Sequence, residues 1–246
     1  YYQDMGYGPQ YQIRLGPRFS GMVRTLVLIN VLVFLWQILS MWVGGGYEIL
    51  RIFGLTPALV LGKLFVWQLV TYLFLHADFF HIFFNMFALW MFGSELERYW
   101  GSHAFLRYFF VTGVGAGFLS VLVDPYSTIP TIGASGSVYG ILLAYALMFP
   151  NRYVYLYFLF PVKVKYFVLA IGAFAFLSAL ASPGSTIAHV AHLGGMLFGW
   201  LYLRGWVRID RLRYAYNQWR MRRLRSRFKV YEQKRRRHDD NDFWIQ

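Results

Sequence analysis

The stretch GASGSVYGILLAYALMF (residues 133–149) places a serine among small residues at the head of an apolar run. The run ends at PNR (150–152), so a helix here extends only from about Ser135 to Phe149. At 1.5 Å per residue such a helix is roughly 22 Å long, which is short of the roughly 30 Å hydrocarbon core of a bilayer. Irregular backbone inside a membrane is tolerated only when it is buried in protein or lines a wet cavity. The sequence therefore predicts a hydrated pocket at Ser135.

The composition of the whole chain indicates a membrane protein. Of its 246 residues, 58% are hydrophobic and 14% are charged, whereas a soluble domain has about 25% charged residues. Apolar segments that approach the length of a spanning helix cover residues 22–43, 79–93, 104–123, 135–149, 166–181 and 187–203. We expect an all-α membrane protein with a six-transmembrane-helix bundle at residues 21–204. An N-terminal tail (1–20) precedes the bundle, and a basic tail (205–246) follows it.

Lysine and arginine are distributed unevenly over the predicted connections. All but Arg51 and Lys63 fall on one side of the bundle, and 14 of them lie in residues 204–237. Because positive residues stay cytoplasmic, we expect both termini to be cytoplasmic. We also expect a multi-pass protein of a bacterial or other prokaryotic inner membrane. The basic tail is expected to lie against anionic lipid headgroups. Nucleic-acid binding is the alternative, and we do not expect it because no aromatic and basic module accompanies the tail.

The connection between the first two apolar segments has a different pattern. Residues 44–76 are apolar, but Gly and Pro interrupt them, and Glu48, Arg51 and Lys63 are spread through them. A spanning helix fits this pattern poorly. We expect an aromatic-rich element that lies in the membrane interface.

Polar side chains inside a bilayer are costly, so each one is a functional candidate. His192 shares a helix face with Gly195 and Gly199, and Gly136 lies beside Ser135. Faces of small residues let two helices approach backbone to backbone, which would bring His192 towards Ser135. A serine hydroxyl becomes a strong nucleophile when a neighbouring imidazole accepts its proton.

Three further residues fit the same reaction. His81 and Asn85 are four residues apart and project from one face of a helix. Their N–H groups, together with the backbone N–H of Ser135, would stabilise the oxyanion of an acyl transfer. Tyr139 follows Ser135 by one helical turn and could hold the imidazole ring of His192.

Each of these features also has a simpler interpretation. A serine or a glycine in a membrane helix can serve packing alone, and a His/Asn pair can merely join two helices. A metal site is a competing use of His76, His81, His189 and His192. The chain has no cysteine and no carboxylate in register with these histidines, so we expect no metal and no cofactor.

Three motifs together resemble the rhomboid family of intramembrane serine proteases. They are GASGSVYG (133–140), HADFFHIFFN (76–85) and AHLGGMLFG (191–199), which occur in the order of the family and on its helices four, two and six. The resemblance covers roughly residues 20–204. It implies a six-helix bundle with a membrane-embedded first loop, which corresponds here to residues 44–76.

The resemblance also implies roles for single residues. Ser135 would be the nucleophile and His192 the general base of a dyad that has no third, orienting acid. His81 and Asn85 would be the oxyanion donors, and Tyr139 would pack against the catalytic histidine. His189 competes with His192 for the role of base, but glycines follow only His192 at the third and seventh positions. The other supporting residues are Gly133, Gly136, Gly195, Gly199 and His76.

Two stretches resemble structural features of the family. Glu97 and Gly101, in ELERYWG (95–101), match a structural turn. Trp67-Gln68 stands where the family usually has Trp-Arg. The glutamine puts the usual arginine contacts of the first loop in doubt.

We therefore predict an intramembrane serine endopeptidase that cleaves transmembrane segments of single-span membrane proteins. Its substrate would pass the fifth apolar segment, under a cap at residues 181–186. One alternative is a catalytically inactive rhomboid-like protein that binds membrane clients, which we expect to lack the serine or the histidine. The other is a transporter or channel, which predicts more intramembrane charge and an inverted repeat; the sequence has neither.

Overall fold

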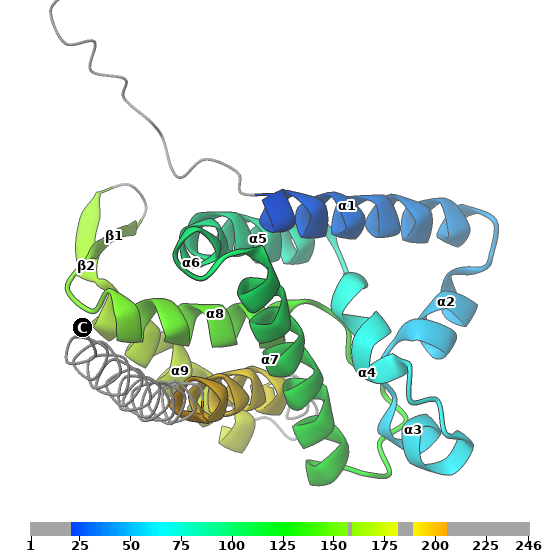
Figure 1. Cartoon of the computed structure of the whole chain (residues 1–246). Helices are drawn as coiled ribbons and strands as arrows, with labels where there is room; N and C mark the ends of the chain where they lie inside the picture. Colours follow the sequence, from blue (N-terminus) through cyan, green and yellow to red (C-terminus); the bar gives the residue numbers. More distant parts are fainter. Residues whose placement is uncertain (1–20, 157–158, 182–188, 206–246) are drawn as a thin grey trace, which may run out of the picture. The chain divides into compact units, whose positions relative to one another are not determined.

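The computed structural model describes residues 21–156, 159–181 and 189–205 (Figure 1). The described residues up to Trp200 belong to one compact unit, and residues from Leu201 onward belong to a second. The segment 189–200 of the first unit is helical, and the described residues 201–205 of the second are helical too. The cap predicted at residues 181–186 falls, apart from its first residue, outside the described residues.

Long apolar helices dominate the described part of the chain. Among the described residues, four helical stretches can cross a membrane by length and composition. They are α1 (Gly21–Trp42), the stretch Phe79–Trp100, α7 (Ser102–Val123) and α9 (Val164–Ala181). Helix α8 (Ser135–Met148) is apolar but has only 14 residues. The all-α membrane class is confirmed, and the count of six spans stays a prediction.

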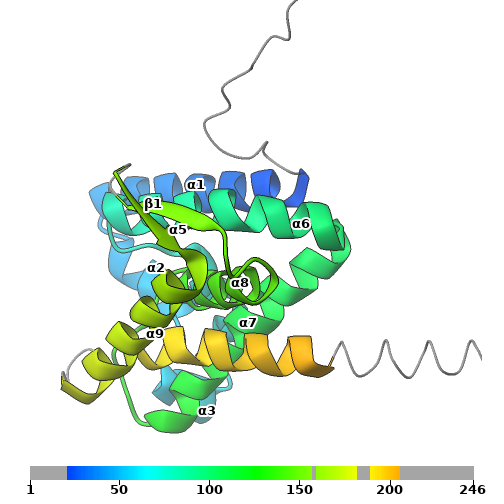
Figure 2. The same ribbon diagram turned by 90° about the vertical axis from the view of Figure 1, so that its left-hand side faces the viewer.

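The stretch Phe79–Trp100 consists of three consecutive helical parts. Helix α5 (Phe79–Ala88) continues through a π-helical turn, η2 (Leu89–Gly93), into α6 (Ser94–Trp100). Helix α1 runs alongside α5 and α6 in both views of the bundle (Figures 1 and 2).

One carboxylate connects the start of α1 to the turn between α6 and α7. Glu97 is buried and accepts hydrogen bonds from the N–H groups of Met22 (2.8 Å) and Val23 (2.9 Å) and from the Ser102 hydroxyl. The first N–H groups of a helix have no partner within it, so Glu97 supplies the cap of α1. Gly101 has φ +79°, a conformation that favours glycine. The two residues thus form the structural turn that the resemblance implied.

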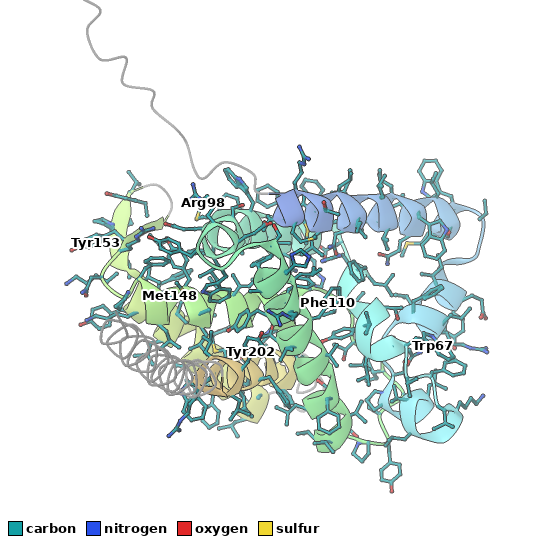
Figure 3. The ribbon with its side chains drawn as sticks, in the orientation of Figure 1. Trp67, Arg98, Phe110, Met148, Tyr153 and Tyr202 are labelled. Atoms are coloured by element: carbon teal, nitrogen blue, oxygen red, sulfur yellow. The ribbon has the colours of Figure 1, made fainter. Side chains whose placement is uncertain are left out.

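The connection between α1 and α5 is built from short helices. These are α2 (Gly46–Phe53), α3 (Pro57–Lys63), α4 (Gln68–Thr71) and the 3₁₀ turn η1 (Tyr72–Phe74). None of them has the length of a spanning helix, in agreement with the pattern of interruptions in the sequence. Figure 3 shows Trp67 in this first loop, away from α8.

Neutral side chains hold the first loop together. Gln68 is fully buried, accepts a hydrogen bond from the Thr56 N–H (3.0 Å) and donates to the carbonyl oxygen of Arg51 (2.8 Å). The indole N–H of Trp67 donates to the carbonyl oxygen of Ile52 (2.8 Å). A glutamine can accept and donate at once, so it satisfies both the N–H and the carbonyl groups of the loop. A guanidinium has donors only.

Helix α8 lies at the centre of the bundle, where Figure 2 shows it nearly end-on. Hydroxyl groups join it to its neighbours: the Tyr108 hydroxyl donates to the carbonyl oxygen of Gly140 (2.8 Å), and Ser137 donates to that of Phe109 (2.7 Å). Such interhelical hydrogen bonds satisfy polar groups that lipid cannot. They fix α8 against α7, and therefore fix the position of its first residue.

A small hairpin separates α8 from α9, which the sequence analysis did not predict. Strands β1 (Tyr153–Leu156) and β2 (Phe160–Lys163) pair antiparallel. Figure 3 shows Met148 on α8 and Tyr153 on the nearby hairpin. Aromatic and β-branched residues favour strands. In a search for apolar helices these residues count only as apolar, so the strand preference of this short segment was overlooked.

Candidate active site

Ser135 is the first residue of α8, and the chain reaches it through a turn that needs glycine. Gly133 has φ +118°, which side chains rarely allow. The Gly133 N–H donates to the carbonyl oxygen of Tyr72 (2.9 Å), which attaches the turn to the first loop. The serine therefore lies at the N-terminal end of a helix, where unpaired N–H groups favour an anion.

His192 contacts Ser135 directly. Its Nε2 lies 2.9 Å from the Ser135 Oγ, although the two residues are 57 positions apart. The helices that carry them touch backbone to backbone, because a Cβ built on Gly195 would overlap the carbonyl oxygen of Gly136. Gly199 does not continue this contact towards α8. A Cβ there would lie near the Tyr108 hydroxyl of α7.

The imidazole ring of His192 packs against an aromatic ring, and its second nitrogen makes no hydrogen bond to the described residues. Tyr139 stacks on it with a centroid distance of 4.2 Å and an interplanar angle of 4°. The Nδ1 of His192 is buried and has no hydrogen-bond partner among the described residues. That arrangement fits a dyad and lacks the orienting acid of a triad.

His189 lies beside His192 without sharing its contact. The two ring centroids are 6.0 Å apart, and the rings are nearly perpendicular. In the described part of the chain, the histidine that hydrogen-bonds Ser135 is His192. Geometry thus favours His192 over its rival as the proton acceptor.

His81 approaches the serine from α5. The Asp78 carboxylate caps that helix by accepting the His81 N–H (2.9 Å), and the Ala77 N–H donates to His81 Nδ1 (3.3 Å). Since Nδ1 accepts a hydrogen bond, a neutral ring carries its proton on Nε2. A Cβ on Gly133 would lie 2.6 Å from that Nε2 and 3.8 Å from the Ser135 Oγ. The His81 ring therefore packs directly against the Gly133 backbone, and any side chain at position 133 would collide with that ring.

Asn85 lies on the same helix, and its side-chain amide already makes one hydrogen bond within that helix. Its Nδ2 donates to the carbonyl oxygen of His81 (2.8 Å), one turn earlier, and its side chain is buried. An amide nitrogen carries two hydrogens, so one remains for an oxyanion. The helical spacing brings Asn85 onto the His81 side of the site.

His76 is buried behind His81, and its backbone is held by a residue that the sequence analysis missed. Its ring centroid lies 5.0 Å from that of His81, and neither ring nitrogen has a partner in the described part of the chain. Gln37 of α1 accepts the His76 N–H (3.0 Å) and donates to its carbonyl oxygen (3.3 Å). An amide in the middle of an apolar segment was the available signal.

The histidines do not gather around a common point. Within residues 21–156, 159–181 and 189–205, no group of three or more His, Cys, Asp or Glu side chains could hold a metal ion. The histidine rings of the candidate site instead lie next to one another in two pairs, His76 with His81 and His189 with His192.

These observations define a class: a multi-pass helical membrane protein with a serine–histidine pair at the head of a short central helix. The sequence model of the rhomboid domain matches residues 63–209, more than half of the chain. The chain therefore belongs to the rhomboid family.

Several relatives share its sequence at moderate identity. The mitochondrial Rhomboid protein 1 of Saccharomyces cerevisiae is 30% identical over 216 residues, which cover 84% of this chain and 58% of that protein. The rhomboid protease GluP of Bacillus subtilis is 31% identical over 140 residues, or 54% of this chain and 24% of GluP. The human mitochondrial presenilin-associated rhomboid-like protein is 30% identical over 192 residues, 74% of this chain and 47% of that protein. The chain thus spans at most 58% of the length of these relatives.

Proposed function

We propose that this chain is an intramembrane serine endopeptidase that cleaves transmembrane segments of single-span membrane proteins. The observation that carries the proposal is the 2.9 Å contact between His192 Nε2 and Ser135 Oγ. In the first step Ser135 Oγ attacks the scissile carbonyl carbon while His192 accepts the hydroxyl proton. His192 then gives that proton to the leaving amine, and water hydrolyses the acyl-enzyme with His192 again as the base.

The neighbouring donors support acyl transfer over a purely structural role. The oxyanion would form next to the Ser135 Oγ, where the Nε2–H of His81, the Ser135 N–H and the remaining Asn85 N–H could donate to it. Donors placed where charge develops are worth about 10²–10³ in kcat each. The absence of a side chain on Gly133 is what lets the His81 ring lie this close to the turn before Ser135.

The substrate must lose helical structure before it reacts, because helical amides are hydrogen-bonded and shielded. Passage past α9 is supported by its weak attachment: few of its residues are buried, among them Val164, Val168 and Ala175. Cysteine pairs that crosslink α9 to α5, introduced into this Cys-free chain, should block cleavage of a membrane substrate. Unchanged turnover after complete crosslinking would reject this route.

The proposed location is a prokaryotic inner membrane with both termini cytoplasmic. The orientation rests on the asymmetry of Lys and Arg. The choice of membrane is consistent with one group of the relatives, which include both bacterial and mitochondrial proteins. We propose further that the basic tail contacts anionic lipid headgroups. The tail lies outside the described residues from position 206 onward.

The decisive experiment compares the wild type with Ser135→Ala and His192→Ala in liposomes that contain a single-span reporter. Cleavage by the wild type and its loss in both variants are expected. Ser40→Ala is the matched control, because it removes a serine hydroxyl from α1, which carries neither Ser135 nor His192.

A fluorophosphonate probe distinguishes the protease from an inactive client-binding relative. It should label the wild type and Ser40→Ala but not Ser135→Ala. A wild type that binds the reporter and is neither labelled nor active would reject the protease and favour the client-binding alternative.

A further inference from the structure

An apolar groove runs between α1 and the α5–η2 stretch. Its volume is 580 Å³, and every side chain that lines it is apolar. Val27, Val31 and Ile38 line it from α1, and Phe79, Phe83 and Trp90 line it from the other side. Several lining residues are also open to the surroundings: Val31, Phe79 and Phe83 are 38%, 65% and 47% exposed. The groove therefore faces the lipid and is not enclosed in the protein.

The dimensions of the groove match a hydrocarbon chain. From Val27 to Ile38 the helix rises about 16 Å, which is close to half of the roughly 30 Å hydrocarbon core, or one leaflet. A helix is about 10 Å across with its side chains, much wider than a single hydrocarbon chain. A helix could only rest on the rim, whereas an acyl chain is narrow enough to lie inside.

A positive charge stands at one end of the groove. Arg24 precedes Val27 by three residues and Val31 by seven, so all three share one face of α1. Arg24 is exposed, and the salt bridges of the described residues join other partners, Arg51–Glu48 and Arg152–Glu95.

The acidic group at this end of α1 is withdrawn from the surface. Glu97 is 3% exposed and accepts hydrogen bonds from the backbone of Met22 and Val23 and from Ser102. The surface at this end of the groove is therefore positive. This surface can attract a phosphate group, and the buried carboxylate of Glu97 is not exposed to repel it.

We propose that the groove binds one acyl chain of an anionic phospholipid whose headgroup contacts Arg24. The lipid belongs to the leaflet on the side where α1 begins. The site is separate from Ser135 and His192, and the proposal does not depend on proteolysis. A bound lipid would fill the space between α1 and α5, and thereby support the helix that carries His81.

A fluorescence-quenching experiment tests the proposal in the full chain. Single cysteines replace Val31 inside the groove or Leu32 outside it, at nearly equal depth, and carry a fluorophore. The proteins are reconstituted in phosphatidylcholine vesicles in which a minor component, phosphatidylglycerol or phosphatidylcholine, carries brominated chains. One basic residue near the membrane surface favours an anionic lipid about fivefold. The Val31 label should therefore show about that excess quenching by the phosphatidylglycerol, relative to the Leu32 label.

Two arginine variants locate the headgroup. Arg24→Gln should remove the excess quenching at the Val31 label, and the control Arg107→Gln, which alters an exposed arginine on α7, should leave it intact. Two results would overturn the proposal. One is an equal excess of quenching by phosphatidylglycerol at both labels, and the other is an excess at the Val31 label that survives Arg24→Gln. A third outcome would also overturn it. If two copies of the Val31→Cys protein form a disulfide and neither lipid quenches the label, the groove binds a second copy of the chain.

Discussion

The ring of Tyr139 lies parallel to the imidazole of His192, with 4.2 Å between centroids and 4° between planes. Tyr139 is one turn along α8 from Ser135. The helix that presents the hydroxyl therefore also presents the surface on which the imidazole rests. Because both contacts come from one rigid element, the Oγ–Nε2 geometry depends little on loops.

Replacement of Tyr139 tests whether this stacking orients the base. Tyr139→Ala should lower kcat/KM on a single-span reporter about 10²-fold, as expected for a misplacement of about 1 Å. Tyr139→Phe keeps the ring and should remain near the wild type. Thermal unfolding of both variants controls for misfolding. Wild-type rates in a folded Tyr139→Ala protein would show that the stacking has no part in orienting the histidine.

The two proposed oxyanion donors, His81 and Asn85, should contribute unequally to kcat. His81→Ala removes the donor that faces Gly133 and should lower kcat about 10²–10³-fold. Asn85→Ala should cost less, because one of its N–H groups already bonds the His81 carbonyl oxygen. Single-turnover rates on the reporter measure both variants. A larger loss for Asn85→Ala than for His81→Ala would reverse this assignment.

The pH dependence of cleavage reports the role of His192. Its Nε2 can accept the serine proton only in the neutral ring, so acid removes the base, and kcat/KM should fall as the pH falls. The rate should recover on return to neutral pH. A flat profile across the histidine range, with the chemical step shown to be rate-limiting, would contradict proton transfer to His192.

Contact between the two site helices should be sensitive to one added side chain. Gly195→Val would place carbon atoms on the Gly136 carbonyl oxygen. We expect it to lower the free energy of unfolding by about 1–3 kcal/mol and to abolish labelling by the fluorophosphonate. Gly62→Ala is the control, because nothing lies within 4 Å of a Cβ there. Full labelling of Gly195→Val would show that the serine–histidine contact does not require this approach.

The Gln37 amide should stabilise the segment that precedes α5. Gln37→Leu leaves the His76 N–H and carbonyl groups buried without partners, at a cost of about 1–3 kcal/mol in the free energy of unfolding. Asn30→Leu, on the same helix, is the control. The Asn30 Oδ1 has no partner among the described residues, and its Nδ2 only bonds the Leu26 carbonyl oxygen within α1. Equal losses in the two variants would contradict a special role for the Gln37–His76 pair.

Much of the fold could be predicted because a bilayer restricts what a sequence can do. Apolar length located α1, α7 and α9, and the PNR stop predicted that α8 would be short. The hairpin at Tyr153–Lys163 escaped this reasoning, because strand pairing depends on a partner that a local pattern does not reveal. The Gln68 contacts escaped it too, since a neutral amide can satisfy backbone groups in several ways.

By itself the sequence determined which side chains had to avoid lipid, because each polar group in an apolar segment needs a protein partner or water. Ser135, His192, His81 and Asn85 were found in this way. Only the tertiary structure decided which partners they have. It brings His192 to Ser135 across 57 residues, turns Gly199 towards Tyr108 instead of α8, and leaves an apolar groove between α1 and α5. These outcomes depend on how close two backbones come, which is set by packing over the whole bundle and by no single segment.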